Sequence, residues 1–203
     1  IKPTKIAEIN NKADPTTEII ANIIEKIILT YLDTSKVKTM NSMFSGCRSL
    51  TSLEVNSGLF NVAYVQDFAY LFTNCQKLQN IPFVLKQTQP NVKDMSYMFT
   101  NCSSLTSIDL KQFNTNQCTK MTELFSGCES AKYIEVNGLD TSGLFDMKGF
   151  FKDCKSVASL DISTFNTANV DDMKILNKNL KAVDKKGVII SYELSDKGLM
   201  LTG

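Results

Sequence analysis

The sequence predicts an α/β repeat protein, a leucine-rich-repeat solenoid with parallel strands on its concave face and short helices on its convex face. Three observations carry this prediction. One sequence block recurs every 26 to 28 residues along most of the 203-residue chain. Each block contains an apolar pattern of helical spacing and then a shorter pattern of period two. Units of this kind bury their apolar faces only by stacking on their neighbours.

The repeated block reads V-x-x-M-x-x-M-F-x-x-C-x-S-L-x-x-L-x-L. Several of its positions recur with the same steps, and such agreement between columns does not arise by chance. The phenylalanine column contains Phe44, Phe72, Phe99, Phe125 and Phe151, and the cysteine column contains Cys47, Cys75, Cys102, Cys128 and Cys154. A third column, mostly of methionine, contains Met40, Phe68, Met95, Met121, Met147 and Met173.

The first half of the block predicts a short helix. Val37, Met40, Met43 and Phe44 lie at i, i+3, i+6 and i+7, which places them on one face of about two helical turns. The residue before each cysteine is of a type that tolerates positive φ, so we expect each helix to end there in a left-handed cap. These cap positions are Gly46, Asn74, Asn101, Gly127 and Asp153.

The second half of the block predicts a strand. Its apolar residues follow the spacing L-x-x-L-x-L, and the last of them alternate with polar residues as in a half-buried strand. Stacked repeats would pair these strands in parallel. Three of the sets are Leu50/Leu53/Val55, Leu105/Ile108/Leu110 and Val157/Leu160/Ile162.

The block resembles the surface leucine-rich-repeat proteins of the BspA type, which occur in bacteria, mycoplasma lipoproteins and some parasitic protists. The resemblance covers about residues 24–176 and is carried by Phe113-Asn114-Thr115, Met121, Phe125, Gly127-Cys128 and Ser104–Leu110. Repeat two departs most, with Phe68 for Met and Pro82 where an acidic residue is expected. The resemblance implies a secreted or cell-surface protein that acts in adhesion, in contact with a host or other cells, or in assembly.

The two ends of the chain are predicted to be caps. Residues 1–23 would form an N-terminal cap with a short helix, in which Asp14 is the N-cap and Pro15 the first helical residue. Residues 24–176 would hold about six repeats, beginning with a strand at 24–29. Residues 177–203 would close the array with a β-hairpin. A single helix over 15–31 is the alternative at the first end.

Composition excludes several kinds of chemistry. The chain has no histidine, which excludes Ser/His/Asp and Cys/His nucleophilic sites and imidazole metal ligands. A net charge of +1 argues against nucleic-acid partners, and no apolar run predicts membrane insertion. Phosphate-binding loops and EF-hand spacing are absent from the sequence. We therefore expect no enzyme activity, no cofactor and no metal site, and we interpret a chain that begins at Ile1 as a mature or trimmed fragment.

The cysteine column predicts buried free thiols. Five cysteines in one column cannot pair completely, and Cys118 takes a position held by valine in other repeats. Disulfides between neighbouring repeats, or a metal or catalytic cysteine, remain the alternatives. The methionine and phenylalanine columns are interpreted as core. Asn101-Cys102-Ser103 matches a glycosylation sequon, although Asn101 is already explained as a cap.

The outward positions of the strands are the candidate binding residues, because they would line the concave face. They are Ser52, Glu54, Asn80, Ser107, Asp109, Tyr133, Glu135, Ser159 and Asp161. Stacked carboxylates repel one another unless a cation or a basic partner lies between them, so the row could bind a basic or hydroxyl-rich partner or, weakly, a divalent cation. Alternatively, the acidic residue belongs to the repeat and accepts a hydrogen bond from the following turn. Tyr133 is the aromatic residue of the row.

These features predict a non-catalytic recognition or adhesion module. Its partner would be a protein or glycan on a host or neighbouring cell surface, bound by modest contacts spread along the concave face. The alternative is a rigid spacer or assembly unit of a larger surface protein. An intracellular scaffold with reduced thiols also remains open.

Overall fold

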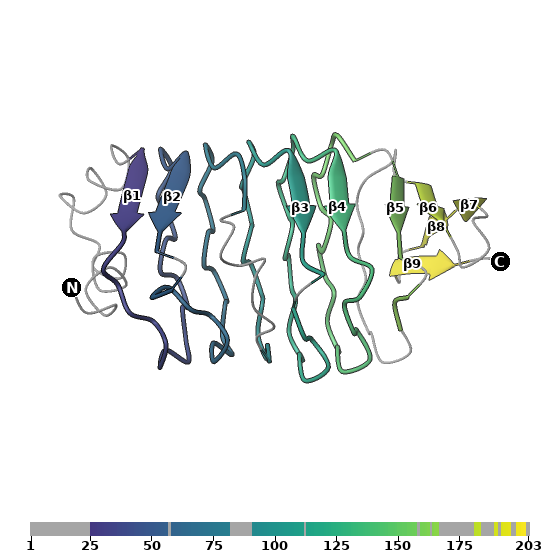
Figure 1. Ribbon diagram of the computed structural model, residues 1–203. Helices are drawn as coiled ribbons and strands as arrows, with labels where there is room; N and C mark the ends of the chain where they lie inside the picture. Colours follow the sequence, from purple (N-terminus) through teal and green to yellow (C-terminus); the bar gives the residue numbers. More distant parts are fainter. Residues whose placement is uncertain are drawn as a thin grey trace.

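Successive turns of the chain lie side by side and form an elongated stack in the computed structural model (Figure 1). The structure describes residues 25–56, 58–81, 91–111, 113–157, 159–162 and 164–166, together with strand residues 181–183, 189–190, 192–195 and 198–201. The predicted N-terminal cap over 1–23 lies outside the described residues.

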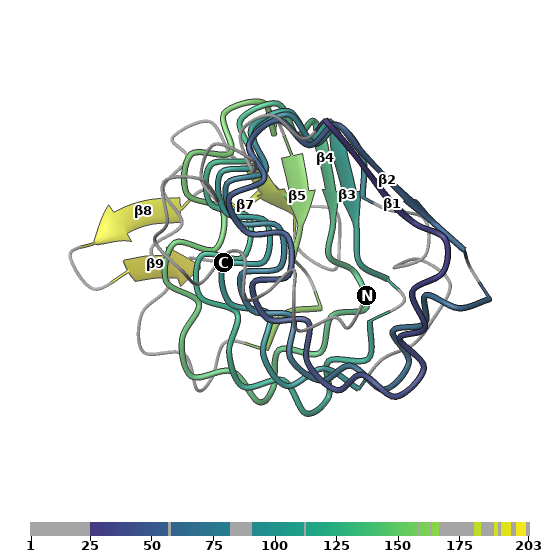
Figure 2. The same cartoon turned by 90° about the vertical axis from the view of Figure 1, so that its left-hand side faces the viewer.

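Nine short strands are present among the described residues. They are β1 (Lys26–Leu29), β2 (Ser52–Val55), β3 (Ser107–Asp109), β4 (Tyr133–Glu135), β5 (Ser159–Asp161), β6 (Lys181–Val183), β7 (Ile189–Ile190), β8 (Tyr192–Ser195) and β9 (Gly198–Leu201). β1–β2, β3–β4 and β5–β6 pair in parallel, whereas β6–β7 and β8–β9 pair antiparallel. Seen along the stack, β1 to β5 lie on one side of the coil (Figure 2).

The strands of the repeats form because alternate side chains meet the core. Ile108 of β3 and Ile134 of β4 are buried and lie opposite each other in the register, while Ser107 and Tyr133 point to solvent. β1 lies where the sequence predicts a first strand, and its backbone is not part of a long helix. β8 and β9 form a hairpin in the region for which the sequence predicts one.

The part of the chain that the structure describes contains no α-helix, so the expected helices on the convex face are wrong there. Residues 40–47 form consecutive turns instead, in which Met43 N donates to Met40 O and Cys47 N donates to Phe44 O. Ser42 has a φ of 58°, which interrupts a helix at its centre. We call residues 40–47 and their equivalents in later repeats the turn segments.

Hydrogen bonds between repeats replace those of the expected helix. Every second N–H of a turn segment donates to a carbonyl of the next repeat, as in Met40 N to Asp67 O (2.9 Å) and Phe44 N to Leu71 O (3.0 Å). The same bonds recur from Phe72 N to Met98 O and from Phe99 N to Leu124 O. Contact with the neighbouring repeat therefore overrides the local helical preference of these residues.

The left-handed caps predicted from the sequence are confirmed. Gly46, Asn74, Asn101, Gly127 and Asp153 all have positive φ values, between 55° and 78°. They end the turn segments just before the cysteine column. The sequence therefore located the end of each segment correctly although the segment itself is not helical.

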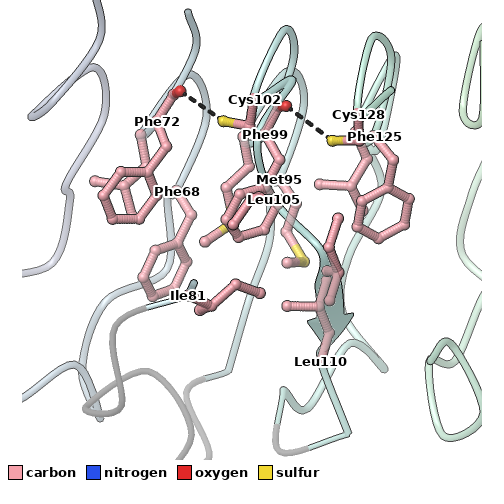
Figure 3. Packing of buried hydrophobic residues seen from close by; sticks show 14 of the residues in the cluster. Phe68, Phe72, Ile81, Met95, Phe99, Cys102, Leu105, Leu110, Phe125 and Cys128 are labelled. Carbon is pink, nitrogen blue, oxygen red and sulfur yellow. Dashed lines mark hydrogen bonds between the residues drawn. The ribbon is translucent and has the colours of Figure 1, made fainter. Parts of the chain in front are cut away.

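The predicted columns form the core. Phe99 is fully buried, and its ring stacks between those of Phe72 and Phe125, with centroids 5.9 and 6.3 Å apart and planes within 10° (Figure 3). The ring of Phe44 stacks on that of Phe72 in the same way, at 5.3 Å. The described methionines of the third column are buried as well. The interpretation of these columns as core is confirmed.

Buried threonines also join the repeats. The hydroxyl of Thr115 donates to Asp140 O (3.1 Å) and accepts from Asp140 N (2.7 Å). Thr141 makes the same pair of bonds with Asn166. Val62 takes the equivalent position in repeat two and is fully buried. Each threonine thus satisfies a backbone donor and acceptor of the next repeat.

The cysteine column is buried and its thiols are free. Four of the five thiols donate to the phenylalanine carbonyl of the preceding repeat, as in Cys102 Sγ to Phe72 O (3.1 Å) and Cys128 Sγ to Phe99 O (3.3 Å; Figure 3). Cys75 and Cys154 make the equivalent bonds. The column therefore contributes both apolar volume and a weak donor at each junction between repeats.

We expect these thiols to be unreactive in the native protein at pH 8 and the chain to lose stability above pH 9. Burial raises the pKa of Cys47 to about 11 and that of Cys154 to about 12, from 9.0 for an unperturbed thiol. The folded chain therefore holds protons that the unfolded chain releases as the pH rises from 9 toward 11. Urea unfolding between pH 7 and 10.5 measures this loss. Fast labelling of the folded chain by a thiol reagent at pH 8 would contradict the expected lack of reactivity.

Candidate functional site

The outward side chains of the strands form one surface, which we call the strand face. On β3 and β4, Ser107 lies opposite Tyr133 and Asp109 lies opposite Glu135, so four predicted site residues come together. On β2, Ser52 and Glu54 lie opposite Lys26 and Ile28 of β1, which the sequence did not place in the site. Asn80 is exposed but lies outside the strands, and Asp161 is exposed on β5. The side chain of Ser159 lies outside the described residues.

The carboxylates of the strand face already have partners within the stack. Glu54 forms an ion pair with Lys26 (2.5 Å) and Glu135 forms one with Lys111 (3.2 Å). Asp161 Oδ2 accepts a hydrogen bond from Asn137 Nδ2 (2.9 Å). All of these groups are at least partly exposed to solvent, so each pair contributes little to stability. The pairs do relieve the repulsion that a bare row of carboxylates would produce.

The acidic residues also cap the turns that follow their strands. Asp109 Oδ1 accepts from Lys111 N (3.0 Å), and Glu135 Oε1 accepts from Asn137 N (3.1 Å). This is the arrangement that the alternative interpretation of the acidic row predicts. A structural role for these two carboxylates is therefore present, and the second oxygen of Glu135 is the one paired with Lys111.

Tyr133 is the largest exposed apolar group among the predicted site residues. Its side chain is 74% exposed on β4, beside Ser107 of β3 and on the same side of the sheet as the Asp109 and Glu135 carboxylates. A planar ring next to carboxylate and hydroxyl groups can stack on a sugar or an apolar side chain while its neighbours accept hydrogen bonds.

Two further properties of the described residues concern metal binding and thiol chemistry. There, no group of three or more Cys, Asp or Glu side chains is placed to hold a metal ion. Burial also raises the pKa of the Cys102 and Cys128 thiols well above the usual range, opposite to the shift that activates a nucleophile. Within the same residues, no helix is long and apolar enough to cross a bilayer.

The turn segments carry an aromatic pair that lies outside the predicted site. The rings of Tyr70 and Tyr97 stack 4.8 Å apart with an interplanar angle of 9°. Equivalent positions in other repeats hold Ser42, Glu123 and Gly149. Tyrosine at this position in two consecutive repeats was the sequence signal that could have revealed the pair. The sequon asparagine lies on the same segments, where Asn101 Nδ2 donates to Asn74 Oδ1 (2.8 Å).

The chain matches a known family. The model of the family described as "Mycoplasma protein of unknown function, DUF285" matches residues 20–106 and 93–196. No curated protein matches the chain. No solved structure matches it either.

Proposed function

The chain belongs to the DUF285 family of Mycoplasma proteins of unknown function, and we propose that it is a non-catalytic recognition module that binds a protein or glycan through its strand face. The exposed ring of Tyr133 beside Ser107, Asp109 and Glu135 carries this proposal. The stacked repeats are proposed to be a leucine-rich-repeat solenoid, as the resemblance to BspA-type proteins implies. Secretion or display on a cell surface, and a partner on a host or neighbouring cell, are parts of the same proposal.

The binding mode follows from the shape of the stack. Side chains of successive strands project at intervals along one surface, so a partner would meet several modest contacts and no deep pocket. Tyr133 would supply the apolar contact, and the surrounding carboxylates would accept hydrogen bonds from hydroxyl or amino groups. Such contacts suit an extended glycan or a loop of a surface protein.

A binding screen of the chain against extracellular-matrix proteins, glycans and divalent cations tests this proposal. We expect Tyr133→Ser to weaken the interaction that the screen identifies by about tenfold or more, as for a central aromatic contact. Tyr64→Ser is the matched control, because Tyr64 is 66% exposed but lies in the loop between β2 and the next turn segment. Equal weakening by both variants would contradict a site on the strand face.

The acidic row is tested separately by a variant that removes charge and keeps hydrogen-bond acceptors. Glu54→Gln, Asp109→Asn, Glu135→Gln and Asp161→Asn together should weaken binding of a basic or hydroxyl-rich partner, while the caps of the strand-end turns persist. Unfolding by urea identifies a variant that fails to fold. Binding that is unchanged in this variant and in Tyr133→Ser would exclude the strand face.

One observation favours a second function, that of a rigid spacer or assembly unit in a larger surface protein. Glu54, Glu135 and Asp161 are all engaged by Lys26, Lys111 and Asn137 within the stack. A surface whose charges are satisfied internally serves a spacer well. A series of truncations in which binding follows neighbouring domains would support the spacer.

A further inference from the structure

The turn segments also carry exposed side chains, and two stacked tyrosines lie among them. Tyr70 is 40% exposed and Tyr97 is half-buried, and their rings lie nearly parallel at 4.8 Å. No other exposed aromatic pair stacks among the described residues. The pair is separate from the strand face, and the inference goes beyond the function proposed above.

The backbone holds both tyrosines in a conformation that bulky residues rarely adopt. Tyr70 has a φ of 59° and Tyr97 a φ of 60°. Their N–H groups donate to Ser96 O (2.9 Å) and Thr122 O (2.8 Å) of the next repeat, and the hydroxyl of Thr73 donates to Tyr97 O (2.5 Å). The rings are thus presented by a fixed backbone, so a ligand would not have to order them.

Two carboxylates of later repeats act electrostatically on Tyr97. Glu123 follows Tyr97 in the same column and Asp146 lies one repeat further, and both negative charges act on the Tyr97 hydroxyl, whose pKa is raised mainly by burial. Asp94 lies three residues before Tyr97 and is partly compensated by Lys120, whose Nζ lies 3.8 Å from its carboxylate. The outer face of a tyrosine ring beside negative charge is complementary to a planar cation.

We propose that Tyr70 and Tyr97, with Glu123 and Asp146, bind an arginine-bearing peptide segment of a partner protein. The guanidinium group is planar and weakly hydrated, so it stacks on a tyrosine ring while its N–H groups meet carboxylates. A lysine ammonium is a compact, strongly hydrated charge and gains less from the rings. An extended segment that lies along the stack would place one arginine on the rings and another basic group near Glu123.

Fluorescence anisotropy with a labelled tetra-arginine peptide and the whole 203-residue chain tests the proposal. We expect saturable binding, weaker for a tetralysine peptide and weaker by about tenfold in the variant Tyr70→Ser/Tyr97→Ser. Serine is suitable because Ser42 holds the equivalent conformation, with a φ of 58°. The matched control Tyr31→Ser/Tyr64→Ser removes two exposed tyrosines elsewhere, 94% and 66% exposed, and should keep its affinity within about twofold.

A second variant keeps the test decisive if the double serine variant does not fold. Glu123→Gln retains both rings and should weaken arginine binding about threefold, with the effect vanishing at high salt. Loss of peptide binding in the charge-free variant of the strand face, with binding kept in Tyr70→Ser/Tyr97→Ser, would assign the peptide to the strand face and overturn this proposal. Absence of saturable binding, equal loss in the tyrosine control, or equal affinity for tetralysine would overturn the proposal.

Discussion

Replacing Phe99 by alanine should lower the free energy of unfolding by about 3–5 kcal/mol. The ring is fully buried and stacks against Phe72 on one side and Phe125 on the other. Its loss leaves a cavity at the centre of the phenylalanine column and removes two ring contacts at once, one on each repeat junction. Because each repeat is stabilised mainly by its neighbours, the cavity weakens both halves of the stack. Urea unfolding followed by circular dichroism measures the change.

The control for this prediction is Phe145→Ala, which removes the same side chain from the surface. Phe145 is 60% exposed, so its loss should change the free energy of unfolding by less than about 0.5 kcal/mol. A Phe99 variant no less stable than the Phe145 variant would show that the column does not hold the repeats together. Two separate unfolding transitions in the Phe99 variant would show that its halves have become uncoupled.

The second large effect is expected for Gly127→Ala, at about 2–5 kcal/mol of lost stability. Gly127 has a φ of 75°, which costs any residue with a Cβ atom. A Cβ atom there would also lie 2.5 Å from Asn101 Oδ1 and 3.2 Å from Asn101 Cα of the preceding repeat. The side chain of Asn101 is held by Asn74, and its N–H donates to Ser126 O, so Asn101 has little freedom to move.

Gly46→Ala separates the two causes. Gly46 occupies the same cap position with a φ of 78°, but no atom lies within 4 Å of its would-be Cβ atom. The free energy of unfolding of this variant should fall only by what the left-handed conformation costs, about 1–2 kcal/mol. The difference between the two variants in urea unfolding therefore measures the crowding between repeats. Equal losses would mean that crowding is relieved by movement of Asn101.

Sequence periodicity predicted which residues meet in the core but not the backbone path that brings them there. Met40, Met43 and Phe44 are buried, as their spacing requires. Their turn segment is not a helix, because the N–H groups of Met40 and Phe44 bond to the next repeat. The spacing of apolar residues predicts the direction in which side chains point. It does not predict whether a backbone N–H group bonds within its own segment or to a neighbouring repeat.

The candidate sites show the same limit. Register alone brought Ser107 beside Tyr133 and Asp109 beside Glu135, because parallel stacking aligns equivalent positions. The ion pair of Glu135 with Lys111 depends on a turn whose geometry the sequence does not specify. The tyrosine pair was not predicted because Tyr70 and Tyr97 occupy a column that holds Ser, Glu and Gly in three other repeats and so has no common residue type.

The hydrogen bonds between turn segments all run in the same direction along the stack, and this gives the stack a net dipole. The first of these bonds runs from Met40 N to Asp67 O and the last from Gly127 N to Lys152 O. In all of them the N–H group points toward the later repeats, and the carbonyl that accepts it points toward the earlier ones. Peptide dipoles aligned in this way add up. The later end of the ladder is therefore the positive pole and the earlier end the negative pole. Relative to chain direction, this polarity is the reverse of that in an α-helix, so an anion would be favoured at the last turn segment and a cation at the first.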